Sequence, residues 1–135
     1  MSDDTQTAKK IFFLTATYNR QTLTRKSISD LQKQLCFDDL DAEIWVIEAG
    51  DHEKTNAILK DIVHSNLNLI KVPEDTFWTS AMAIGIERIA DRASADDIII
   101  CFNNDIEIPD QILERIISQV IKQPKLVISP LSVSP

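Results

Sequence analysis

The chain is 135 residues long, enough for one domain and too short for two, and 44% hydrophobic and 26% charged residues are typical of a folded globular protein. Its 14 Lys and Arg against 21 Asp and Glu give a net charge of −7, which excludes a general attraction for nucleic acid phosphates. No apolar run approaches the roughly 18 residues of a membrane span. We therefore expect no nucleic acid partner and no transmembrane segment.

Predicted strands and helices alternate along the chain, after a polar tail over residues 1–9. Short apolar runs predict five strands, over residues 11–14, 44–47, 67–72, 98–102 and 126–128. Stripes with helical spacing predict four helices between them, over residues 23–35, 58–63, 81–89 and 113–121. This order predicts an α/β fold, with a mainly parallel sheet and helices on both faces. Ligands of such sheets bind beyond the carboxyl ends of the strands.

The common nucleotide-binding α/β folds fit the sequence poorly. Gly50 and Gly85 are the two glycines of the chain, so neither a GxGxxG fingerprint nor a GxxxxGK[ST] loop can be assembled. The loop after the first strand carries hydroxyls and Tyr18 where a receiver domain would have an acidic pair. A GxSxG nucleophile elbow is missing as well.

The two cysteines, Cys36 and Cys101, lie in apolar surroundings and show no metal-ligand spacing. Buried free thiols of this kind are typical of a reducing compartment. The start of the chain also lacks the apolar stretch of a signal peptide. We therefore expect a cytoplasmic protein in which both thiols are buried.

A polar cluster follows the fourth predicted strand, where Asn103, Asn104 and Asp105 come directly after an apolar run. A carboxylate at this edge is a good ligand for Mg²⁺ or Mn²⁺, which bind one or two carboxylates together with substrate phosphates. A metal there would neutralise a diphosphate leaving group. The alternative is a simple turn or helix cap, because Asn and Asp are common in both.

Together with three other segments in the same order, this cluster resembles family 2 glycosyltransferases. The other segments are residues 17–20, 44–51 and 76–86, and the likeness extends over about residues 10–130. The resemblance implies a GT-A-like fold, with residues 10–135 forming the half-domain that binds a nucleotide-diphosphate sugar. It also implies transfer of that sugar to a glycan or polysaccharide acceptor.

The resemblance further implies a role for each matched residue. Those expected to bind the nucleotide sugar are Thr17, Tyr18, Arg20, Glu48, Trp78, Asn103 and Asn104. Asp105 is expected to ligate a divalent metal, Mn²⁺ or Mg²⁺, with Asn103 assisting. Glu48 would meet the base or ribose and Tyr18 the base. Arg20 would lie near the diphosphate or simply start a helix, and Trp78 would either wall the sugar pocket or pack in the core.

Several departures from the family pattern leave a second hypothesis open. Glu48 stands in place of an aspartate, and Ala49 and Ala83 replace polar residues. The general base of inverting transfer is expected beyond the C-terminus, so we expect this chain alone to be inactive. An exposed sheet edge would then favour self-association or a second polypeptide. The alternative to an enzyme is a non-catalytic α/β binding or assembly module derived from the same fold.

Overall fold

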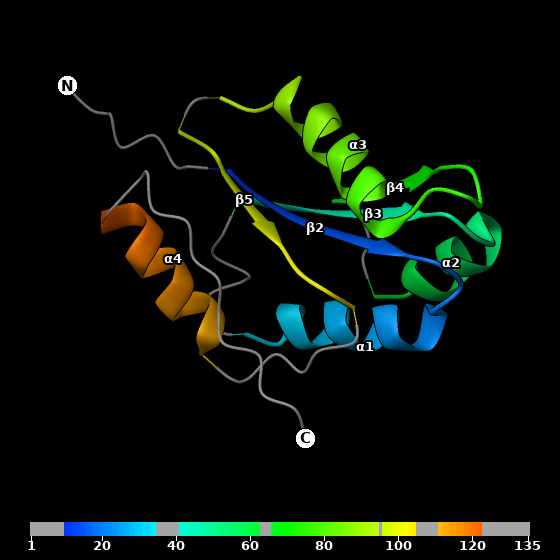
Figure 1. Ribbon diagram of the computed structural model, residues 1–135. Helices are drawn as coiled ribbons and strands as arrows, with labels where there is room; N and C mark the ends of the chain where they lie inside the picture. Colours follow the sequence, from blue (N-terminus) through cyan, green and yellow to red (C-terminus); the bar gives the residue numbers. More distant parts are fainter. Residues whose placement is uncertain (1–9, 35–40, 63–65, 95, 105–110, 123–135) are drawn as a thin grey trace.

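The computed structural model describes residues 10–34, 41–62, 66–94, 96–104 and 111–122. Strands and helices alternate through these segments (Figure 1). In chain order they are β2 (Ile11–Thr17), α1 (Gln21–Gln32), β3 (Ala42–Glu48), α2 (His52–Leu59), β4 (Leu67–Lys71), α3 (Trp78–Ala90), β5 (Ile98–Cys101) and α4 (Ile112–Lys122). The predicted fifth strand, over residues 126–128, lies outside the described residues.

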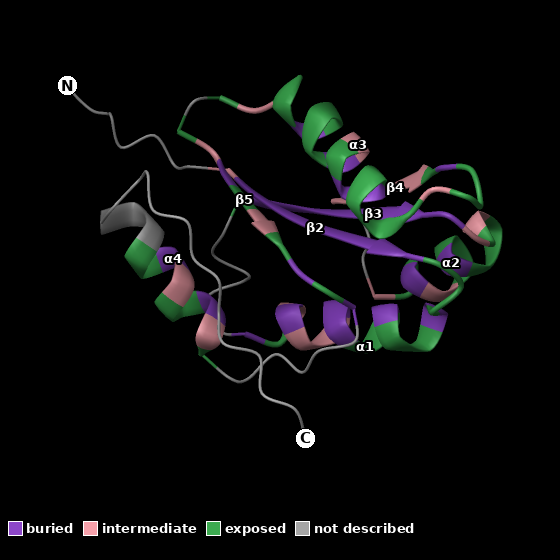
Figure 2. Ribbon diagram, in the orientation of Figure 1, coloured by how far each residue is buried: buried purple, intermediate pink, exposed green. Residues whose placement is uncertain are grey.

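The four strands form one parallel sheet in the order β4-β3-β2-β5. β2 and β3 pair over their whole lengths, from Ile11 with Ala42 to Thr17 with Glu48, and both strands are buried throughout (Figure 2). Because all strands run the same way, their carboxyl ends meet at one edge of the sheet.

Helices cover both faces of the sheet, which confirms the predicted α/β architecture. Side chains of α1, α2 and α4 join one core with Phe13, Ile44 and their neighbours. Side chains of α3 join a second core with Phe12, Leu14 and Trp45 on the opposite face (Figure 1). Since successive residues of a strand point to opposite faces, a strand covered on both sides must be apolar almost throughout.

α3 packs closely on the sheet through Gly85. A Cβ atom at this position would collide with the side chain of Leu14. The missing side chain therefore lets the helix backbone approach β2, and this contact fixes the N-terminal turn of α3 above the carboxyl edge.

None of the helices in the described part combines the length and apolar character needed to cross a bilayer.

Two sequence expectations need correction. Leu23, placed on the core-facing stripe of the first helix, is exposed, while Thr24 beside it is fully buried. Cys101, expected to be buried, is exposed, and β5 is the outermost of the described strands on its side of the sheet. α2 begins at His52, and the side chain of Asp51 caps this helix by accepting from the Lys54 amide at 3.0 Å.

A buried carboxylate, Glu43, joins several segments at the amino ends of the strands. It accepts hydrogen bonds from Lys10 Nζ at 3.0 Å, Arg92 Nη2 at 2.9 Å and Trp45 Nε1 at 2.9 Å. Asn68 Nδ2 donates a fourth bond at 3.3 Å, and the Arg92 guanidinium lies 5.7 Å from the centre of the Trp45 ring. Burial alone would raise the pKa of Glu43, but the bonds from Lys10 and Trp45 and the charge of Arg92 outweigh it, so the pKa lies below the ordinary 4.5.

Because the pKa of Glu43 is lower in the folded state, its ionisation stabilises the fold above the unfolded pKa, and this contribution is lost as the pH falls. We expect Glu43→Gln to lower the free energy of unfolding in urea by about 1–3 kcal/mol at neutral pH. The difference from wild type should close below about pH 4. Exposed Glu87→Gln is the matched control and should behave like wild type. If wild type and Glu43→Gln differ in free energy of unfolding by the same amount at neutral pH and at the low pH, Glu43 contributes packing and not charge.

Candidate functional site

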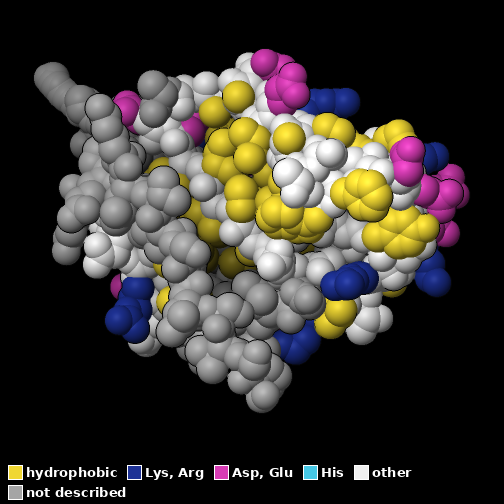
Figure 3. Space-filling view, viewed as in Figure 1, with side chains coloured by type: hydrophobic (Ala, Val, Ile, Leu, Met, Phe, Trp, Pro, Cys, Tyr) yellow, Lys and Arg dark blue, Asp and Glu magenta, His cyan; other side chains and the backbone are white. Residues whose placement is uncertain are grey.

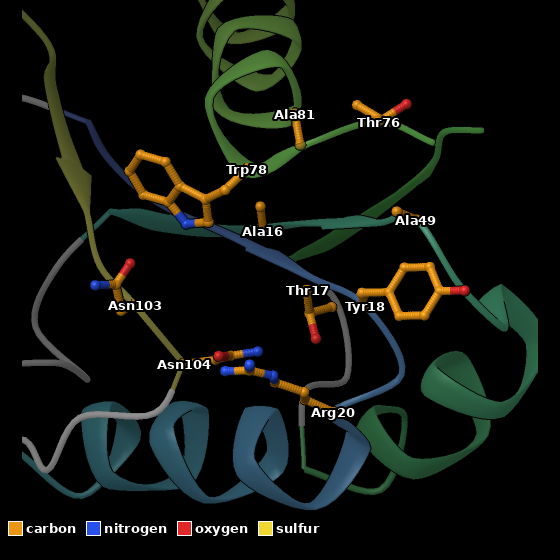
Figure 4. A pocket seen from close by; sticks show the side chains of 10 residues that line it. All are labelled: Ala16, Thr17, Tyr18, Arg20, Ala49, Thr76, Trp78, Ala81, Asn103 and Asn104. Atoms are coloured by element: carbon orange, nitrogen blue, oxygen red, sulfur yellow. The ribbon is translucent and has the colours of Figure 1, made fainter. Parts of the chain in front are cut away.

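A pocket of about 430 Å³ opens at the carboxyl edge of the sheet (Figure 4). Its lining comes from the end of β2, the loops that follow β2, β3, β4 and β5, and the start of α3. The lining residues are Ala16, Thr17, Tyr18, Arg20, Ala49, Thr76, Trp78, Ala81, Asn103 and Asn104. Segments far apart in sequence therefore meet here because their strands are parallel neighbours.

Two aromatic rings flank the pocket, that of Trp78 at the start of α3 and that of Tyr18 after β2 (Figure 4). Both are about half exposed, at 52% and 50%. Between them the lining is small, with the methyl groups of Ala16 and Ala81. Small residues between exposed rings leave space for a flat or ring-shaped ligand.

The Tyr18 hydroxyl donates a hydrogen bond to Glu74 Oε1 at 3.2 Å, which connects the loop after β2 to the loop after β4. The negative charge of Glu74 and this hydrogen bond raise the pKa of Tyr18 above its ordinary value of 10.0. The phenol therefore stays protonated at neutral pH, with its ring beside the pocket.

Asn104 is held by a chain of buried hydroxyl groups. Its Nδ2 donates to Thr24 Oγ1 at 3.0 Å, and Thr24 Oγ1 donates to Thr17 Oγ1 at 3.3 Å. Asn104 is 5% exposed and Thr24 is fully buried, so the chain links β5, α1 and β2 inside the protein. The buried position of Thr24 could not be predicted, because threonines are more often exposed than buried.

Glu48, at the end of β3, is fully buried and does not line the pocket. Its carboxylate accepts hydrogen bonds from the amide of Asn19 at 3.0 Å, the amide of Gly50 at 2.8 Å and the hydroxyl of Thr55. The predicted contact of Glu48 with a base or ribose stays a prediction, and the partners described here are all within the protein.

The structure brings six of the predicted binding residues together. Thr17, Tyr18, Arg20, Trp78, Asn103 and Asn104 all line the pocket. Asp105, the predicted metal ligand, lies outside the described residues. Ala83 is exposed and does not line the pocket. Asn19 was not among the predicted site residues. Its positive φ of 53° could not be inferred, because the loop contains no glycine to indicate such a conformation.

None of the described lining residues offers a carboxylate to a cation. Among those residues, no group of three or more His, Cys, Asp or Glu side chains could hold a metal ion. Asn103 lines the pocket and offers an amide oxygen, a donor type that Mg²⁺ and Mn²⁺ accept. Arg20 supplies the one cationic side chain among the lining residues.

Comparison with known proteins agrees with this architecture. The sequence model of the family described as Glycosyl transferase family 2 matches residues 13–134, which is most of the chain. A search of curated proteins finds no significant match. The family match confirms the resemblance drawn from the four sequence segments.

Tyr18 is the single tyrosine of the chain, so its titration can be followed by ultraviolet absorbance without overlap. We expect its midpoint above pH 10, because ionisation would place a second negative charge beside Glu74. Glu74→Gln should bring the midpoint back toward 10, whereas Glu87→Gln, remote on α3, should leave it unchanged. A wild-type midpoint at or below 10 would contradict the contact between Tyr18 and Glu74.

Proposed function

Because the chain belongs to glycosyl transferase family 2, we propose that its pocket binds a nucleotide-diphosphate sugar for transfer to a glycan or polysaccharide acceptor. The observation that carries this proposal is the meeting of six family-matched residues at the carboxyl edge of the sheet. The volume of about 430 Å³ falls within the range of about 300–1,000 Å³ that is usual for small-molecule sites.

The lining suggests how the parts of such a donor would be distributed. The exposed ring of Tyr18 offers a face for the base, and the ring of Trp78 offers a wall for the sugar. The guanidinium of Arg20 would pair with the diphosphate, since planar guanidinium groups bind phosphate oxygens in pairs. Thr17 and Asn103 add hydrogen-bonding groups for the remaining polar atoms.

We also propose that Asp105, with Asn103, holds Mn²⁺ or Mg²⁺ when the donor binds. Charge supports this: the protein carries a net charge of −7, and the described lining provides one cation for a diphosphate with at least two negative charges. The amide oxygen of Asn103 suits either metal. When bound, the metal would neutralise charge that develops on the leaving diphosphate.

A second candidate function is a non-catalytic binding or assembly module derived from this fold. Three observations favour it. Glu48 directs its carboxylate to groups within the protein, and Ala49 presents a methyl group to the pocket. None of the residues lining the described pocket carries a carboxylate that could serve as a general base for sugar transfer.

Titration calorimetry with UDP, GDP and dTDP, with Mn²⁺ or with EDTA, tests the donor and metal assignments together. We expect weak binding of at least one nucleotide, and a loss of about tenfold or more in EDTA, because an interaction between charged groups is worth about 1.5–3 kcal/mol. Asp105→Ala should reproduce the EDTA result in the presence of Mn²⁺.

Asp96→Ala is the matched control, since it removes an exposed carboxylate just before β5, at the other end of that strand. It should bind nucleotide as wild type does. Equal binding in Mn²⁺ and EDTA, or unchanged binding by Asp105→Ala, would remove the metal from the proposal. Absence of binding by wild type under every condition would remove the donor as well.

We also propose that the outer edge of β5 contacts a second polypeptide, which in the first place is another copy of this chain. No described strand pairs with this edge. Ile99 and Cys101 are exposed there, and Figure 3 shows hydrophobic side chains gathered over α3 and the neighbouring part of β5. An unpaired, apolar strand edge is a template for association.

Light scattering over a concentration series tests this association. We expect the apparent mass of wild type to rise with concentration, and Ile99→Lys to hold it near the monomer, because a charge on an edge strand opposes pairing. Leu23→Lys is the matched control, since it places the same charge at an exposed apolar residue of α1. A wild-type monomer at high micromolar concentration would contradict the proposed contact.

A further inference from the structure

The buried carboxylate of Glu48 connects three segments behind the pocket. Its Oε2 accepts from the backbone amides of Asn19, after β2, and Gly50, after β3. Its Oε1 accepts from the hydroxyl of Thr55 on α2. Glu48 is fully buried, and three bonds within the protein occupy most of the roughly four acceptor positions of its carboxylate, so little of it is left for a pocket ligand.

The side chain of Asn19 also joins the loop after β2 to the loop after β3. Its Oδ1 accepts from the Asp51 amide at 2.6 Å and from Gln21 Nε2 at 3.4 Å. Its backbone adopts φ 53°, a conformation that asparagine tolerates better than most residues. A Cβ atom on Gly50 would lie closer than 3.0 Å to the Asn19 side-chain amide, so the contact requires glycine there.

The residues held in this way are the direct neighbours of the pocket lining. Tyr18 and Arg20 lie on either side of Asn19 in sequence, and Ala49 precedes Gly50; all three line the pocket. A shift of the Asn19 backbone would therefore move an aromatic ring and a guanidinium together. The bonds to Glu48 fix the loop before any ligand arrives.

We propose that Glu48 is a positioning residue, which holds Tyr18 and Arg20 in place through Asn19 and Gly50 and does not itself touch the donor. This inference rests on the proposed binding of a nucleotide-diphosphate sugar. It also gives a reason for glutamate where the family pattern has aspartate: the additional methylene lets the carboxylate reach the amide of the neighbouring loop. Preorganisation of a binding loop lowers the entropy that a ligand must otherwise remove.

Two substitutions, one at Glu48 and one at Gly50, each disrupt the contacts that hold the loop after β2. Glu48→Gln removes the charge that the two amides share, and Gly50→Ala displaces the Asn19 side chain without altering any group that lines the pocket. If Glu48 acts through the loop, each variant should weaken binding of UDP, GDP or dTDP by about tenfold, because binding must then order the loop. The double variant should bind nucleotide no more weakly than the single variant with the lower affinity, because both substitutions release the same loop.

Glu43→Gln is the matched control, because it neutralises the other buried carboxylate of β3 at the opposite end of the strand. It should lower stability and leave the nucleotide dissociation constant unchanged. Should Gly50→Ala bind like wild type while Glu48→Gln binds weakly, or should the two losses multiply in the double variant, Glu48 contacts the ligand directly and the inference is overturned.

Amide NMR shifts of the ligand-free protein test the positioning role apart from nucleotide binding. Amide protons bonded to a carboxylate lie downfield, so the Asn19 and Gly50 signals should move upfield in Glu48→Gln. Unchanged signals would overturn the positioning role even if nucleotides bind. If the signals move but wild type binds none of the three nucleotides, the role in donor binding is overturned together with the proposed function.

Discussion

Burial of β2 on both faces is the constraint on which the rest of the structure depends. This strand lies between β3 and β5, and helices cover it from both sides. Parallel strands joined by helices cover both faces in this way, and parallel neighbours bring their carboxyl ends to one edge. The pocket is a consequence: Ala16 and Thr17 end β2 on opposite faces of the sheet, and both line it.

Apolar runs predicted the fold class because they are local features of the sequence, and the resemblance to the family pointed to six of the residues that line the pocket. The sequence alone did not reveal more of the site. It could not predict which polar residues turn inward. Thr24 fitted an ordinary helix position and Glu48 was expected to meet a base or ribose, yet both are fully buried, because hydrogen-bond partners from distant segments satisfy them. Cys101 was misjudged for a related reason, since the burial of a residue in an apolar run depends on which distant elements cover that part of the sheet.

β3 carries a buried carboxylate near each end, and the two have different surroundings. Glu43 is bonded to cations and a tryptophan, so its charge is balanced inside the fold. Glu48 is bonded to backbone amides and a hydroxyl, neutral groups that orient around it. The first arrangement joins segments at the amino end of the sheet, and the second organises loops at the end where the pocket lies.

The register of β2 has a consequence for how the chain folds. β2 is the first of the described strands in sequence, but one of its two neighbours is the last of them, and the bond from Lys10 to Asp97 spans 87 residues. Closing such long-range parallel contacts is slow. During synthesis, one edge of β2 stays open until β5 has left the ribosome, and a nascent chain in that state is exposed to chaperones and to misassociation.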